Sequence, residues 1–214
     1  MLRGVHPCIQ VEVIVLGMIE NNVYILGDGD ATFVVDPEGH VDSIVAALGD
    51  RPLDAIVLTH AHWDHVGGAA ELRERTGAIT IAGEIDAPYI SGERELDPSH
   101  RPFAPCPIDK TVAVGDVLEI GSMKWKVLET PGHTPGSICL FLDPQYGSDP
   151  QGVPVLIAGD TLFNGAHGRT DFVGGSQSDM IASLARLAKL PGDTMVLPGH
   201  NDLTTIASES WLPR

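Results

Sequence analysis

The sequence lacks the features that mark disulfide-rich, secreted or membrane proteins. Its 214 residues include only three cysteines, Cys8, Cys106 and Cys139, whose odd number and wide spacing predict neither a disulfide framework nor a Cys-x-x-Cys metal site. We expect these thiols to be buried or inert. No apolar run is long enough to cross a bilayer, and residues 1–15 show no export signal. We therefore expect a cytoplasmic protein with no membrane partner.

Positive charge is also scarce. The chain has 13 Lys and Arg residues against 29 Asp and Glu residues, which gives a formal net charge of −16 at pH 7. A polyanion would be repelled at long range, so nucleic acid is disfavoured as a partner. The charge balance does not restrict a small-molecule substrate, because bound metal ions can dominate the local charge of a pocket.

Length and patterning predict one domain over residues 1–214 with mixed α and β structure. Apolar runs and turn residues predict strands over residues 11–16, 22–26, 31–36, 54–59, 117–121, 124–129, 137–142, 155–158 and 194–197. Helical spacing predicts helices over residues 41–48, 69–76 and 176–190. Strands followed by mixed strands and helices, twice over, favour an α/β (α+β) fold with two central sheets and helices outside. Residues 92–110, rich in proline and charge, predict a surface loop that either borders the active site or forms a solvated connection.

Residues 60–65 are the most informative part of the sequence, because four of the six side chains are able to bind a metal ion. They follow the apolar run at residues 55–58 and read His60-Ala61-His62-Trp63-Asp64-His65. Imidazole nitrogens and carboxylate oxygens are ligands of Zn²⁺ and its first-row neighbours. A helix would place His60 and His62 about 200° apart, whereas an extended segment turns residues i, i+2 and i+4 to one side. We therefore expect an extended metal-binding loop that aims His60, His62 and Asp64 the same way. A turn at Gly67-Gly68 would bring His65 beside them, and Trp63 is expected to pack.

Three further segments share one design, in which an apolar strand runs into a glycine-flanked histidine or aspartate. They cover residues 127–133, 155–160 and 195–200, and they end at His133, Asp160 and His200. Each segment places a ligand-type residue just past a strand end, where loops gather, and glycine lets the backbone turn sharply beside an ion. A lone strand-end histidine is more often hydrogen-bonded than ligating. Four such segments in one chain nevertheless favour a shared metal site.

With these motifs the chain resembles the metallo-β-lactamase-fold hydrolase superfamily. The superfamily signature Thr-His-x-His-x-Asp-His-x-Gly-Gly stands here at residues 59–68, and the resemblance continues through residues 131–137, 159–163 and 198–200. It covers the chain from about Asn21 onward and implies a four-layer αββα sandwich with the site at one edge of the two sheets. It also implies two divalent ions, for which we expect Zn with Fe or Mn as alternatives. The implied ligands are His60, His62 and His133 for one ion, Asp64, His65 and His200 for the other, and Asp160 as a bridge.

Within the superfamily, the short glyoxalase II-like branch, also called hydroxyacylglutathione hydrolase-like, is most similar. Residues Gly168-Arg169-Thr170-Asp171 resemble a stretch common there, although for Arg169 and Asp171 themselves we favour an ion pair over substrate binding. True β-lactamases of this fold do not usually offer an aspartate bridge at the position of Asp160, which disfavours antibiotic hydrolysis. Full-length glyoxalase II enzymes carry a C-terminal helical extension that helps to hold glutathione, whereas this chain ends 14 residues after His200. We therefore expect the glutathione-binding part to be missing or differently built.

The resemblance implies a hydrolase in which a dimetal-bound hydroxide attacks the acyl carbonyl of a small molecule, and we expect a thioester. Asp64 is expected to have a catalytic role as well, either orienting the hydroxide or passing its proton to the leaving group. The alternative is a mononuclear iron persulfide dioxygenase, which would use only His60, His133 and Asp160. A non-catalytic module would be expected to have lost a ligand, and none is missing. The sequence leaves open the acyl and leaving groups, the native metal and the oligomeric state.

Overall fold

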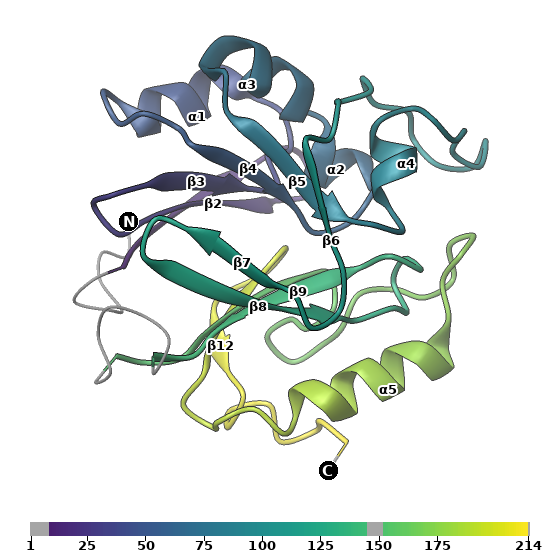
Figure 1. Ribbon diagram of the computed structural model, residues 1–214. Helices are drawn as coiled ribbons and strands as arrows, with labels where there is room; N and C mark the ends of the chain where they lie inside the picture. Colours follow the sequence, from purple (N-terminus) through teal and green to yellow (C-terminus); the bar gives the residue numbers. More distant parts are fainter. Residues whose placement is uncertain (1–8, 145–151, 214) are drawn as a thin grey trace.

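Two six-stranded sheets lie face to face in the computed structural model, which describes residues 9–144 and 152–213 (Figure 1). In spatial order, the first sheet contains β1 (Gln10–Leu16), β2 (Asn21–Gly27), β3 (Thr32–Val35), β4 (Ala55–Leu58), β5 (Ile79–Gly83) and β6 (Lys110–Val112). The second contains β12 (Thr204–Thr205), β11 (Met195–Pro198), β10 (Val155–Gly159), β9 (Ile138–Leu142), β8 (Met123–Glu129) and β7 (Val117–Ile120).

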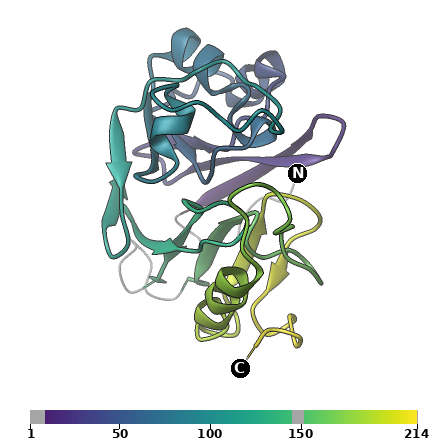
Figure 2. The same cartoon turned by 90° about the vertical axis from the view of Figure 1, so that its right-hand side faces the viewer.

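Helices cover the outer faces of both sheets. Helices α1 (Val41–Leu48) and α3 (Ala69–Thr76) lie outside the first sheet, and α5 (Gln177–Leu187) lies outside the second (Figures 1 and 2). Two single turns, α2 (Trp63–Val66) and α4 (Ala87–Ile90), follow β4 and β5. This arrangement confirms the predicted αββα sandwich. Within the described residues, no helix combines the length and apolar composition of a membrane span.

Apolar side chains fill the space between each pair of layers. The central cluster lies between the two sheets and includes Phe33 and Trp125, whose rings meet edge to face at 5.7 Å. A second cluster includes Ile44 and Leu72 of the helices on the first sheet, and a third includes Leu184 of α5. Burial of these faces is the main driving force for the sandwich. Cys106 and Cys139 are buried free thiols, as predicted, whereas Cys8 lies outside the described residues.

The connectivity brings the ends of several strands to one edge of the sandwich. Strands β3, β4 and β5 run parallel to one another, and so do β10 and β11. Parallel strands have their carboxyl ends on the same side of a sheet, so the segments that follow them are neighbours in space. Hydrogen bonds join the two sheets at this edge, from Ile138 N–H to the Thr59 carbonyl (3.0 Å) and from Asn22 N–H to the Gly199 carbonyl (2.7 Å).

The predicted strands and helices are present, with shifts of a few residues at their ends. The sequence patterns missed the short elements β5, β6, β12, α2 and α4. Such segments carry too few residues for a clear periodicity, and their conformation depends on the tertiary contacts around them. The shift with most consequence is at Trp63–Val66, where a helical turn replaces part of the predicted extended loop.

Candidate metal centre

The metal-binding loop changes conformation in its middle, so the expectation of one extended segment is wrong. His62 has extended dihedral angles (φ −101°, ψ 146°), and the helical turn α2 begins directly after it. The amides of His65 and Val66 both donate to the His62 carbonyl, at 2.9 and 3.0 Å. The loop therefore divides its side chains between two groups, with His60 and His62 in one and Asp64 and His65 in the other.

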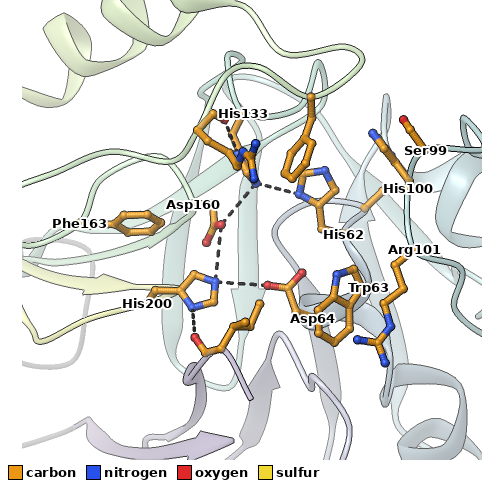
Figure 3. Close-up of a pocket in the computed structure, with 14 residues that line it drawn as sticks. His62, Trp63, Asp64, Ser99, His100, Arg101, His133, Asp160, Phe163 and His200 are labelled. Carbon is orange, nitrogen blue, oxygen red and sulfur yellow. Dashed lines mark hydrogen bonds and ion pairs between the residues drawn. The ribbon is translucent and has the colours of Figure 1, made fainter. Parts of the chain in front are cut away.

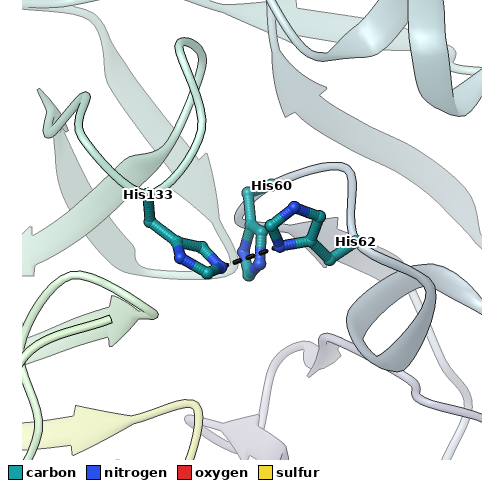
Figure 4. A group of neighbouring side chains, drawn as sticks. All are labelled: His60, His62 and His133. Atoms are coloured by element: carbon teal, nitrogen blue, oxygen red, sulfur yellow. Dashed lines mark hydrogen bonds between the residues drawn. The ribbon is translucent and has the colours of Figure 1, made fainter. Parts of the chain in front are cut away.

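The two groups are completed by residues from the second sheet. His133 joins His60 and His62 (Figure 4), and His200 joins Asp64 and His65; in each group the candidate ligand atoms lie within 4.8 Å of one another. The structure thus brings together the residues that the resemblance assigned to each ion. Four of these six residues come from the loop after β4, while His133 follows β8 and His200 follows β11.

Asp160 lies between the two groups. It directly follows β10, and its Oδ1 is 3.2 Å from Nε2 of His65 while its Oδ2 is 3.3 Å from Nε2 of His133. Oδ2 also lies 3.7 Å from Nε2 of His200 (Figure 3). One carboxylate therefore faces both groups, which is the position that a bridging ligand would take.

Outer hydrogen bonds fix the orientation of the buried rings in the loop. The Asp36 carboxylate, 2% exposed at the end of β3, accepts from Nδ1 of His65 at 2.9 Å and from the Thr59 hydroxyl at 2.7 Å. Because the Thr59 hydroxyl proton is used in this way, its oxygen accepts from Nδ1 of His60 at 3.0 Å. Both rings therefore donate outward from Nδ1 and turn Nε2 toward the centre.

Backbone carbonyls do the same for the two histidines of the second sheet. Nδ1 of His133 donates to the Arg169 carbonyl at 2.7 Å, and Nδ1 of His200 donates to the Ile19 carbonyl at 3.1 Å. His62 differs, because its Nδ1 points inward and lies 2.7 Å from Nε2 of His133. Because His133 carries its proton on Nδ1, its Nε2 is an acceptor. The hydrogen bond between the two rings is therefore donated by Nδ1 of His62.

Unsatisfied atoms show that the cluster fits a cation. Nε2 of His60, Nε2 of His65 and Oδ1 of Asp160 are buried without a hydrogen-bond partner among the described residues. Buried polar atoms normally find a partner, and these nitrogen and oxygen atoms converge on one space. Divalent first-row metals take such ligands. The donor set and its geometry therefore fit the metal ions that the resemblance implies.

The electrostatics of the cluster point the same way. Burial lowers the pKa of His60 well below its usual range, and burial together with His133 lowers the pKa of His62 to about 3. Burial alone would raise the pKa of Asp160, but His65 and the other histidines lower it to about 2, and Asp64 is also held below its usual range. Burial opposes protonation of His65, yet the surrounding carboxylates raise its pKa well above the usual value. The ionised carboxylates thus attract a positive charge, and metal ions would replace the proton on His65 that they hold here.

Close backbone approaches hold the second-sheet loops against the centre. A Cβ on Gly199 would collide with Oδ1 of Asp160 and would lie 2.7 Å from Cε1 of His65, so only glycine fits before His200. The Pro198 carbonyl accepts from the Tyr24 hydroxyl at 2.7 Å and from the Asn22 side chain at 3.0 Å. Strand β2 of the first sheet therefore positions the His200 loop of the second.

Asp86 has a similar role on the opposite side of the centre. This buried carboxylate accepts from the Ala61 amide at 2.9 Å and from the Thr134 hydroxyl at 2.8 Å. It thereby joins the loop that carries His60 and His62 to the loop that carries His133. The sequence motifs did not predict a role for either Asp36 or Asp86. Asp36 follows the apolar strand β3 as Asp160 follows β10, so the same strand-end pattern was available for it.

A cavity of about 520 Å³ opens onto the cluster (Figure 3). Besides five of the candidate ligands, its walls include Ser99, His100 and Arg101, so the 92–110 loop borders the site. Arg169 also lines the cavity, and its guanidinium forms the predicted ion pair with Asp171 through two contacts of 2.6 Å. His167 is outside the cluster and donates to the Gly168 carbonyl.

Comparison with known proteins identifies the family. Residues 17–200 match the sequence profile of the metallo-β-lactamase superfamily. The chain belongs to this superfamily. The resemblance drawn from the four motifs is thus confirmed, and the cluster fits a metal-dependent hydrolase of the metallo-β-lactamase superfamily.

Relatives within the superfamily match along nearly the whole chain. The chain is 33% identical over 202 residues to the probable metallo-hydrolase YqgX of Bacillus subtilis, covering 91% of each protein. It is 29% identical over 209 residues to the hydroxyacylglutathione hydrolase GloC of Haemophilus influenzae, covering 93% of this chain and 94% of the relative.

Solved structures of similar proteins share the fold. The B3 metallo-β-lactamase BLEG-1 superposes with a TM-score of 0.80 at 31% identity, covering 94% of this chain and 96% of that one. The di-iron-bound form of TTHA1623 superposes with a TM-score of 0.77 at 32% identity, covering 94% and 97%.

Replacement of Asp36 by alanine tests the outer hydrogen bonds. The Asp36→Ala variant should bind metal about 10- to 100-fold more weakly, because the His65 ring loses its acceptor and the Thr59 hydroxyl, which accepts from His60, loses the carboxylate that fixes it. Competition with a chelator of known affinity measures this change, and circular dichroism verifies the fold. The matched control is Asp42→Ala, whose side chain is 94% exposed and pairs with Arg75. Equal affinities in the two variants would contradict the positioning role.

Replacement of His133 tests the ligand assignment directly. His133→Ala should purify with less metal per chain than the unaltered protein, because one ligand group loses a member. Elemental analysis of the purified proteins provides the measurement. His167→Ala, which removes a histidine outside both groups, should keep its full metal content. A normal stoichiometry in His133→Ala would exclude it as a ligand.

Proposed function

We propose that this protein is a metal-dependent hydrolase that cleaves the acyl bond of a small-molecule thioester in the cytoplasm. The observation that carries the proposal is the convergence of five imidazoles and two carboxylates into two ligand groups with Asp160 between them. A site that holds two ions is built for attack by water on an electrophilic centre. The similarity to the hydroxyacylglutathione hydrolase GloC, at 29% identity over 93% of the chain, supports a thioester as the substrate.

Seven residues would hold two divalent ions, namely His60, His62, Asp64, His65, His133, Asp160 and His200. When bound, such ions supply an activated water as nucleophile and polarise the acyl carbonyl. Zinc is the ion we propose, with iron or manganese as alternatives, because histidine and carboxylate suit all three. The di-iron-bound form of TTHA1623, which is 32% identical to this chain, keeps iron as a real alternative.

Asp64 is the residue best placed to handle a proton. It is 6% exposed, lines the cavity, and its Oδ2 lies 3.2 Å from Nε2 of His200 and 3.3 Å from Nε2 of His65. Burial opposes ionisation of Asp64, but His65 and a hydrogen bond from His200 hold its pKa below the usual range. The side chain is therefore ionised and is able to accept a hydrogen bond from the nucleophile.

The first experiment pairs elemental analysis with activity assays on the purified protein. We expect two metal ions per chain and hydrolysis of a thioester such as S-lactoyl-N-acetylcysteamine, with both lost after treatment with a chelator and restored by the metal. Persulfide-dependent oxygen uptake with one iron per chain would instead support the dioxygenase alternative. Cleavage of a chromogenic β-lactam with no thioester cleavage would favour the activity named for BLEG-1, which is 31% identical to this chain.

A conservative change at Asp64 tests its catalytic role. Asp64→Asn should lower kcat for the thioester by about two orders of magnitude or more, because the variant loses a metal ligand or the proton acceptor. Metal analysis of the variant separates these two causes. Asp116→Asn is the matched control and should retain its activity, because the exposed Asp116 side chain accepts from the Ala113 amide and lies outside the cavity wall. Turnover near that of the control would remove the proposed role of Asp64.

A further inference from the structure

The cavity wall carries positive charge beside the candidate ligands. The only carboxylates that line the cavity within the described residues are Asp64 and Asp160, which belong to the ligand groups. Outside the ligand groups, the ionisable side chains in the wall are His100, Arg101 and Arg169. These three are all basic residue types, in a chain whose formal net charge is −16.

The two arginines differ in their pairing. The guanidinium of Arg169 donates to both oxygens of Asp171, so a carboxylate of the chain already neutralises it. Arg101 has no carboxylate within ion-pair distance among residues 9–144 and 152–213. Its guanidinium lies over the face of Trp63, whose ring centre is 3.9 Å from the guanidinium carbon. Arg101 thus supplies the unopposed charge at the mouth.

Stacking on Trp63 fixes where that charge is located. Trp63 stands between the candidate ligands His62 and Asp64 in sequence, and Figure 3 shows its ring beside the Asp64 carboxylate with the Arg101 side chain next to it. A guanidinium that lies on an aromatic face keeps its N–H groups free along its edge, where a carboxylate can bind through two parallel hydrogen bonds. Arg101 is therefore an exposed cation held in a defined orientation next to the centre.

The neighbouring His100 adds a second polar group. It lines the same cavity and contacts the rings of His62 and Phe172, at 5.3 and 6.0 Å between ring centres. Neither of its ring nitrogens has a hydrogen-bond partner within the described part of the chain. The 92–110 loop thus brings two adjacent side chains with free hydrogen-bonding capacity to the entrance.

We propose that Arg101 binds a carboxylate carried by the substrate, so that the substrate class is an anionic thioester. The inference rests on the proposed function, because the reacting acyl group would lie at the neighbouring metal centre. The net charge of the chain repels anions at long range, and an unpaired arginine beside the entrance offsets that repulsion where the substrate enters. A bidentate pair with Arg101 would also orient the substrate relative to the centre.

Three thioesters test this proposal in the metal-loaded protein. S-acetyl-N-acetylcysteamine is neutral, S-succinyl-N-acetylcysteamine carries a carboxylate on the acyl side, and S-acetyl-3-mercaptopropionate carries one on the thiol side. In Arg101→Gln, KM for at least one charged thioester should rise about tenfold or more, with kcat and the KM of the neutral thioester nearly unchanged. The charged substrate that responds identifies the side on which the carboxylate lies.

A matched control and a binding measurement separate this inference from the proposed function. Arg94→Gln removes an arginine of the same loop that lies outside the cavity wall, near the Tyr89 ring, and should leave all three KM values unchanged. If the unaltered protein cleaves none of the thioesters, the proposed function fails. Calorimetric binding of the corresponding uncleavable thioethers then still tests Arg101. Equal effects of Arg101→Gln on charged and neutral compounds, in KM or in affinity, would overturn the proposal and leave Arg101 as a packing partner of Trp63.

Discussion

The metal centre depends on one constraint, which is that four of its five imidazoles are oriented by a partner on Nδ1, namely those of His60, His65, His133 and His200. Asp36 meets most of this need on the first sheet, because its carboxylate accepts from the Thr59 amide, the Thr59 hydroxyl and the His65 ring. It adopts a left-handed backbone conformation (φ +51°), an uncommon one for a residue other than glycine. Burial of this carboxylate is compensated by three hydrogen bonds. The same hydrogen bonds connect the end of β3 to the end of β4 and to α2.

Convergence of the two sheets follows from contacts at the same edge. The Tyr24 hydroxyl and the Asn22 side chain hold the Pro198 carbonyl, while Asp86 joins Ala61 to Thr134. In sequence, Pro198 lies 174 residues from Tyr24 and 176 from Asn22, and Thr134 lies 48 residues from Asp86. They align loops that come from opposite layers of the sandwich. A rigid pair of sheets with short loops at one edge is well suited to hold ligands within a fraction of an ångström.

The sequence predicts the ligand residues better than it predicts their arrangement. The apolar strands followed by His133, Asp160 and His200 can be recognised in the sequence, because each of these ligands lies within a few residues of its strand. The helical turn at Trp63–Val66 is not visible in this way, because four residues are too short for helical periodicity and the turn depends on its surroundings. The outer partners of His133 and His200 are backbone carbonyls of Arg169 and Ile19, 36 and 181 residues away. A carbonyl is present at every position, so no residue type marks these partners.

Chemistry and specificity are therefore encoded in different parts of this chain. The candidate ligands directly follow buried strands, where a change in sequence would disturb the core as well as the centre. The residues that could distinguish one acyl compound from another lie in connecting segments around the cavity, such as Arg101 in the 92–110 loop and Phe172 close to Arg169. The candidate ligands indicate membership of the superfamily, but membership does not determine the residues that surround the cavity. Proteins named as a hydroxyacylglutathione hydrolase and as a metallo-β-lactamase both match this chain over most of its length, so the shared fold alone does not determine the substrate.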